Sequence, residues 1–314
     1  MTASEAHAPE THAIERRRRA RRGLAVYLGV VVVLSALIEG LIMARGGPLE
    51  EHVGLVFALM WTPTLAMIVA RVALREGVKD VSFRLGLRDG GWREWLVAWL
   101  YPVGVGAAAY GLAWATGLAP FAVSDGLKGF IGDPPAPIAV ALSLGLTLTL
   151  GTALSALTAT GEELGWRGYM LTRLIDAGVP RPALVSGAIW ALWHAPLILS
   201  GQYAAGPSPV LSTATFFVGM LAVSYVFARV RLASGSVWPA VLFHAAWNAV
   251  IQGAWDGFVP GHGASHAGNV WVGESGVLVL AAHLVAAPAL TWVAFRVQRF
   301  PKDPKPRAAS VRTL

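Results

Sequence analysis

The chain has 314 residues, of which 55% are hydrophobic and only 14% are charged. Soluble domains carry about 25% charged residues, so this composition excludes an ordinary soluble domain. The net charge is +7, but the Arg and Lys residues stand at the ends of apolar segments. That placement indicates that the basic residues set the orientation of membrane helices and contact anionic lipids, rather than bind nucleic acid. The absence of cysteine excludes disulfides, thiolate metal sites and a cysteine nucleophile.

Apolar stretches of about 20 residues, the length that crosses ~30 Å of hydrocarbon, recur along the chain. We therefore expect an all-α fold: a polytopic helical membrane protein of about eight transmembrane helices, with a polar site inside the bundle. Clusters of Pro and Gly such as Gly46-Gly47-Pro48 separate several of the segments. The segments are expected at 24–44, 53–74, 95–117, 136–158, 182–200, 211–229, 236–254 and 275–297.

The chain divides into a basic N-terminal tail (1–23), a transmembrane domain (24–300) and a C-terminal tail (301–314). The first apolar run, Leu24–Ala44, is too long for the apolar region of a signal peptide, so we expect a retained helix. Counting Lys and Arg by side places the N- and C-termini in the cytoplasm, because only Arg45 and Lys128 then lie outside.

The stretch Phe83–Leu96 contains Trp92 and Trp95 and is predicted to lie at the cytoplasmic interface of the membrane. Tryptophan side chains at the level of the headgroups anchor helices there. An ordinary loop with aromatic residues explains the same pattern.

Ionisable groups in or beside a hydrocarbon layer are costly and therefore mark functional sites. The densest group lies in Gly161–Gly168, where the fourth segment reaches the cytoplasmic side. Glu163 and Arg167 are spaced i, i+4, so they can pair on one helix face. Glu162 lies about 100° around the helix and is expected in a less polar setting that suits a general base. The alternative is a solvated Glu/Arg cluster at a helix end.

Two further groups lie on later segments. His194 follows two tryptophans and precedes Pro196, and by itself a histidine in such a place is more often a packed residue than a catalyst. His244 and Asn248 are spaced i, i+4 and project from one face of an apolar helix. They can both reach one substrate atom, or they can bond a neighbouring helix.

Taken together, the three groups resemble a known family. The order Glu-Glu-x-x-x-Arg, aromatic-x-x-x-His and His-x-x-x-Asn is similar to the three motifs of the CPBP intramembrane proteases, also called the Abi family. That family includes CAAX prenyl endopeptidases and bacteriocin-processing and self-immunity proteins. The resemblance covers the motif core 160–250, and one departure is Trp190, where many members have Phe.

The resemblance implies an intramembrane endopeptidase that hydrolyses peptide bonds of membrane-associated peptides or proteins. In similar proteins the first Glu and the second-motif His activate a water molecule, roles that fall here on Glu162 and His194. The oxyanion would be stabilised by His244 and Asn248. Glu163 and Arg167 would support the site.

Dependence on a metal stays open at this stage. A single divalent ion such as Zn²⁺ could be held by Glu162, His194 and His244, or the enzyme could be Glu-dependent with no cofactor. We favour the metal-independent alternative, because the chain contains no His-Glu-x-x-His.

A non-catalytic membrane protein, either an immunity or scaffold factor or a transporter, could use the same polar core. A transporter would favour broken helices in matching halves, and the sequence shows no such symmetry. The expected partners are a peptide or membrane-protein substrate and the lipid bilayer, with no nucleic acid. The high Ala, Arg, Gly and Trp content is typical of a GC-rich bacterial genome, so we expect an integral protein of a bacterial plasma membrane.

Overall fold

The computed structural model describes residues 3–88, 91–123, 128–129, 132, 134–260, 262–263, 266–267 and 269–295. The predicted C-terminal tail, 301–314, lies outside them. The helices before the motif core are α1 (Ala3–Arg45), η1 (Leu49–His52), α2 (Val53–Leu74), η2 (Lys79–Val81) and α3 (Trp92–Thr116). The motif core and its flanks hold α5 (Ala136–Leu146), η3 (Thr147–Gly151), α6 (Thr152–Gly165), η4 (Trp166–Met170), α7 (Leu171–Asp176), α8 (Pro182–Leu199), α9 (Pro209–Ser234), α10 (Trp238–Trp247) and η5 (Asn248–Trp255). After them come η6 (Asp256–Phe258), β1 (His262–Gly263), β2 (His266–Ala267) and α11 (Val277–Phe295).

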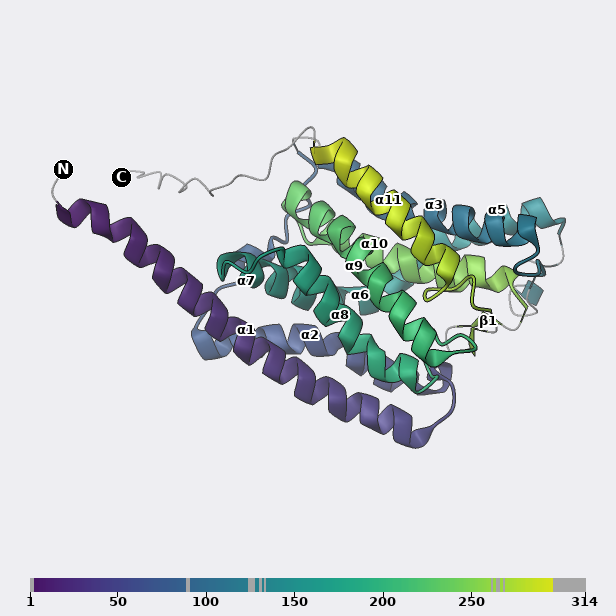
Figure 1. Ribbon diagram of the computed structural model, residues 1–314, viewed down its shortest axis with the longest axis horizontal. Helices are drawn as coiled ribbons and strands as arrows, with labels where there is room; N and C mark the ends of the chain where they lie inside the picture. Colours follow the sequence, from purple (N-terminus) through teal and green to yellow (C-terminus); the bar gives the residue numbers. More distant parts are fainter. Residues whose placement is uncertain are drawn as a thin grey trace.

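The predicted all-α membrane fold is confirmed. Within the described ranges, six helical runs are long and apolar enough to cross a membrane, and Val277–Leu290 is a shorter apolar helix. Helices α10 and η5 add one more continuous run through Trp238–Trp255. The helices pack side by side as a bundle (Figure 1). Together these features support an integral membrane protein.

The fourth membrane segment is much longer than the predicted 136–158. Its helical run continues without a break from Ala136 to Asp176, 41 residues in all, and carries the Glu-Glu-x-x-x-Arg motif in its second half. Two π-helical stretches, η3 and η4, lie within it. The run continues because its polar residues find partners inside the bundle, which the sequence alone does not reveal.

Two glycines let α6 approach α2 closely. A Cβ at Gly161 would lie 2.7 Å from the Met60 carbonyl oxygen, and one at Gly165 would lie 2.4 Å from the Pro63 Cβ. A hydrogen bond also joins the two helices, since the Thr64 hydroxyl of α2 donates to the Gly161 carbonyl of α6 at 2.6 Å. Small residues four apart permit such contact between membrane helices. The two glutamates between these glycines are thereby carried into the protein interior.

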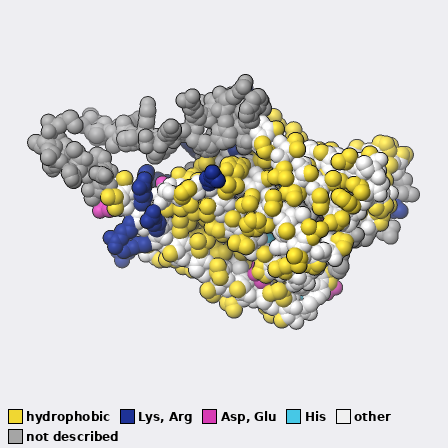
Figure 2. Space-filling view, in the orientation of Figure 1, with side chains coloured by type: hydrophobic (Ala, Val, Ile, Leu, Met, Phe, Trp, Pro, Cys, Tyr) yellow, Lys and Arg dark blue, Asp and Glu magenta, His cyan; other side chains and the backbone are white. Residues whose placement is uncertain are grey.

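Helix α1 begins well before the membrane segment that it contains. The predicted tail 1–23 is helical from Ala3 onward. This N-terminal part of α1 projects beyond the other helices (Figure 1). Figure 2 shows Lys and Arg side chains gathered at this end, whereas most of the face shown is apolar. A basic end beside an apolar surface is the pattern expected of a helix that enters a membrane.

Candidate active site

The centre of the site is an ion pair buried between helices. Glu163 is 0% exposed and Arg167 is 1% exposed. Arg167 Nη1 lies 2.7 Å from Glu163 Oε1, which confirms the predicted i, i+4 pairing. The same carboxylate oxygen accepts a hydrogen bond from His244 Nδ1 at 2.9 Å. One carboxylate thus joins the first motif to the third.

Aromatic rings enclose the guanidinium of Arg167. Its Cζ lies 4.2 Å from the ring centroid of Trp190 and 3.8 Å from that of Phe227. Cation–π contact favours a charged group that has lost its water. The alternative of a solvated Glu/Arg cluster is therefore wrong, and the cluster is part of the interior.

Glu162 points in another direction and meets different partners. Its Oε2 accepts hydrogen bonds from the indole nitrogens of Trp166, at 3.1 Å, and Trp190, at 2.8 Å. Its Oε1 lies 3.9 Å from His244 Nε2. The predicted difference between the two glutamates is therefore visible: Glu163 pairs with an arginine, whereas Glu162 is held by neutral donors and is 1% exposed.

His194 reaches the site through Trp190. Its Nδ1 lies 2.8 Å from the Trp190 carbonyl oxygen. A carbonyl can only accept, so Nδ1 carries the proton and Nε2 is the basic nitrogen of the neutral ring. The ring packs at 4.7 Å from Trp193 and 5.0 Å from Phe216, measured between centroids. Trp190 therefore bridges the two predicted water-activating groups, with its indole on Glu162 and its carbonyl on His194.

A narrow pocket of about 20 Å³ is lined by three of the predicted residues, His194, His244 and Asn248. The α-helical geometry of α10 ends as Asn248 begins η5, and the Asn248 N–H still bonds the His244 carbonyl. The i, i+4 relation therefore holds, and both side chains face the same pocket. Trp190 and His244, which contact Glu162, form part of its wall.

One acidic residue of the pocket was missed from the sequence. Glu274 lines the pocket and accepts hydrogen bonds from Trp247 at 2.6 Å, from Gln252 at 3.0 Å and from the Tyr203 hydroxyl. Burial raises the pKa of Glu274, although these hydrogen bonds act to lower it. Tyr203 in turn stacks on His194, with 5.5 Å between ring centroids. The signal was an acidic residue directly before the last apolar segment, where a charge is costly.

The proposed metal ligands are not gathered into a cluster of three in the part of the chain that the structure describes. Among the described residues, no group of three or more His, Asp or Glu side chains is placed to hold a metal ion. Protein groups hold one atom of each candidate ligand, namely Glu162 Oε2, His194 Nδ1 and His244 Nδ1, while His244 Nε2 lies 3.9 Å from Glu162 Oε1. We therefore derive no step through a metal, and the zinc hypothesis stays a prediction.

The arrangement suits proton transfer and stabilisation of negative charge. It combines a carboxylate held by neutral donors, a histidine with a free basic nitrogen, and a second histidine next to an amide. Such groups in a dry setting act more strongly on a reacting carbonyl than they would in water.

Two comparisons with known proteins agree with this chemistry. Residues 144–250 match the family model described as Type II CAAX prenyl endopeptidase Rce1-like. The chain is also similar to CAAX prenyl protease 2 of Methanococcus maripaludis, with 33% identity over 97 residues, which cover 29% of this chain and 36% of the relative. The chain thus matches about a third of the length of that relative. Both findings support a place in the CPBP family of CAAX proteases, as the motifs predicted.

Proposed function

We propose that this CAAX-protease-like chain is an intramembrane endopeptidase that hydrolyses peptide bonds of membrane-associated peptides or proteins. One observation carries the proposal: the polar residues of all three motifs converge on one buried site. Glu162 and Glu163 contact His244, and Trp190 connects Glu162 to His194. The family match over residues 144–250 supports a protease in general.

In the proposed reaction, Glu162 and His194 activate a water molecule. A water oxygen attacks the scissile carbonyl carbon as its proton passes to Glu162 or to His194 Nε2. The C–N bond of the tetrahedral intermediate then breaks, and the same proton moves to the leaving amine. General acid–base transfer of this kind contributes typically 10²- to 10⁴-fold to a rate.

His244 and Asn248 are the proposed oxyanion donors. Asn248 can donate from its amide nitrogen without carrying charge, and His244 in its protonated form can donate from Nε2. Glu163 holds His244 Nδ1 at 2.9 Å, which fixes the direction of the ring. Arg167 fixes Glu163 in turn, at 2.7 Å. Glu163 and Arg167 are therefore proposed as supporting residues that orient the donors.

The proposed substrates carry an apolar or lipidated end. Aromatic and aliphatic side chains, among them Phe216, Met220 and Val223, line the pocket beside the two histidines. The Glu pair was expected where its segment reaches the cytoplasmic side, but the helical run continues to Asp176, and Gly161 and Gly165 pack on the middle of α2, so the pair lies deep in the bundle.

The proposal is tested by cleavage assays on purified protein in lipid nanodiscs. Candidate peptides with and without a C-terminal prenyl group are incubated with wild type, Glu162→Gln and His194→Gln. We expect each substitution to lower kcat at least about 100-fold. Glu39→Gln is the matched control, because Glu39 is a buried acid on α1 outside the site, and it should keep full activity.

Thermal unfolding of each variant separates loss of chemistry from loss of fold. Full activity of both site variants would refute the assigned roles. A chelator arm addresses the metal question, since activity should persist after treatment. Activity that is lost to chelator and restored by Zn²⁺ would overturn the metal-independent mechanism.

A further inference from the structure

The segment 77–88, between α2 and α3, is here called the strap, because it is bonded to helices on both of its sides. On one side it is bonded to the turn that joins α9 to α10. The Trp238 indole donates to the Phe83 carbonyl at 2.7 Å, and Arg84 Nε donates to the Gly235 carbonyl at 3.0 Å. The Val237 N–H donates to the Ser82 carbonyl at 3.2 Å. The strap is thus fixed to the start of the helix that carries His244.

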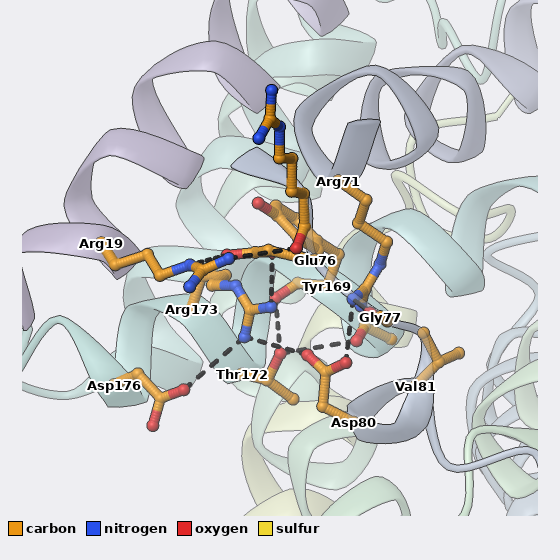
Figure 3. A network of polar contacts seen from close by, with 12 residues as sticks. Arg19, Arg71, Glu76, Gly77, Asp80, Val81, Tyr169, Thr172, Arg173 and Asp176 are labelled. Atoms are coloured by element: carbon orange, nitrogen blue, oxygen red, sulfur yellow. Dashed lines mark hydrogen bonds and ion pairs between the residues drawn. The ribbon is translucent and has the colours of Figure 1, made fainter. Parts of the chain in front are cut away.

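On its other side the strap is bonded to α2 and α7. Asp80 lies 2.9 Å from Arg71 on α2 and 2.9 Å from Arg173 on α7, and Arg173 also binds Glu76 at 2.7 Å (Figure 3). Val81 is 0% exposed. A Cβ at Gly168, within η4, would lie 3.1 Å from the Val81 Cγ1. The strap therefore packs directly on the helical turn that contains Arg167.

One buried side chain, Arg231 of α9, joins the strap to that turn. It is 4% exposed. Its Nη2 donates to the Asp80 carbonyl at 2.8 Å and to the Val81 carbonyl at 3.3 Å. Its Nε donates to the Arg167 carbonyl at 3.2 Å. All three acceptors are backbone oxygens, so Arg231 holds the backbone of the strap and the backbone of η4.

The π-helical geometry of η4 explains why the Arg167 carbonyl is an acceptor for a side chain. In an α-helix that oxygen would accept from the N–H of Leu171, four residues later. Here the Leu171 N–H bonds the Trp166 carbonyl instead, five residues back. The Arg167 oxygen thus loses its α-helical donor, and Arg231 supplies one. Because buried carbonyls need partners, the Arg231 contact stabilises the π turn.

We propose that Arg231 is a positioning residue of the site, which holds η4 and the strap together and so sets the place of Glu163 and Arg167 relative to His244. The effect on catalysis rests on the proposed function. The effect on the strap does not, and it can be measured without a substrate.

The experiment uses the full chain in nanodiscs with Arg231→Gln and Arg231→Lys. The chain contains no cysteine, so the alkylation rate of the thiol in Val81→Cys reports whether the strap stays packed on η4. We expect Arg231→Gln to raise that rate at least about tenfold. It should also lower kcat on the order of 10- to 100-fold, since small misplacements of reacting groups have effects of that size. KM should stay within about twofold, because no substrate contact is lost.

The matched control is Arg229→Gln, two residues earlier on α9. Arg229 binds Glu94 of α3 at 3.1 Å and the Leu290 carbonyl at 2.6 Å, away from the strap. It should lower thermal stability without changing kcat or the alkylation rate. Arg231→Lys keeps a donor at the same place and should recover part of both readouts, and it serves in place of the Gln variant if that variant fails to fold.

Unchanged alkylation and kcat in Arg231→Gln would overturn the proposal. So would equal effects of Arg229→Gln, which would make Arg231 a general stabiliser of α9. If the wild type cleaves no tested peptide, the proposed function fails separately, and the alkylation rates still decide whether Arg231 holds the strap.

Discussion

Removing the charge of Glu163 should destabilise the protein strongly, because it leaves a buried arginine without its counter-ion. Glu163 is 0% exposed and lies 2.7 Å from Arg167, which is 1% exposed. Breaking such a pair by removing one partner costs about 3–5 kcal/mol. Contact of the guanidinium with Trp190 and Phe227, worth about 0.5–2 kcal/mol, persists in the variant. For Glu163→Gln we therefore expect a loss near the lower limit, about 3 kcal/mol.

The assay is reversible unfolding in mixed detergent micelles, followed by circular dichroism, with cleavage activity measured in parallel. Glu94→Gln is the comparison, because Glu94 and Arg229 form a pair at 3.1 Å whose side chains are 9% and 15% exposed. Glu94→Gln should lower the free energy of unfolding less than Glu163→Gln does. Activity of Glu163→Gln should fall as well, since His244 Nδ1 loses a charged acceptor at 2.9 Å.

A double substitution separates the electrostatic explanation from simple packing loss. Replacing Glu163 by Gln and Arg167 by Met removes both charges, and well-packed apolar substitutes for a buried pair are often neutral. The double variant should regain stability relative to Glu163→Gln without regaining activity. A single variant that loses less than about 1 kcal/mol, the range of exposed pairs, would refute the reasoning.

Three further predictions follow from other contacts. Partial burial acts to raise the pKa of Asp80, but two neighbouring arginines hold it below its ordinary value. Its stabilising effect is therefore present above that ordinary value and lost as pH falls through the lowered pKa, so the difference in Tm between wild type and Asp80→Asn should be full near pH 7 and shrink on acidification. Trp190→Phe removes a 2.8 Å hydrogen bond to Glu162 and should cost about 1–3 kcal/mol in chemical unfolding, and an unchanged midpoint would contradict the assigned bond. Gly165→Ala places a Cβ 2.4 Å from α2 and should cost about 1–3 kcal/mol, whereas Gly104→Ala, with open space around it, should be nearly neutral in the same melts.

The sequence predicted what depends on local spacing. Glu163 and Arg167 pair as the i, i+4 rule requires, and His244 and Asn248 face one pocket. Apolar length predicted the helical membrane fold. Each of these features is determined by residues within one or two helical turns, so a pattern in the sequence can reveal it.

Features that depend on long-range contacts were not predicted. The stretch beginning at Phe83 was expected to lie at a membrane interface. Nothing in its composition showed that the Phe83 carbonyl would accept from Trp238, or that the Arg84 side chain would donate to the Gly235 carbonyl, both some 150 residues later. Glu274 was missed for the same reason, because its partners Tyr203 and Trp247 are distant in the chain. Hydrogen bonds to backbone oxygens leave no periodicity to detect.

The π-helical turn at Trp166–Met170 limits how the length of this chain can vary. A π turn holds about one residue more than the α-helix around it, and each residue rotates a helix by about 100°. Deleting Gly168 would allow α geometry but would turn Arg173 away from Glu76, or Glu163 away from His244. Insertions and deletions that a loop accepts should therefore be rejected between Glu163 and Arg173, and variation in length among functional variants should fall outside that interval.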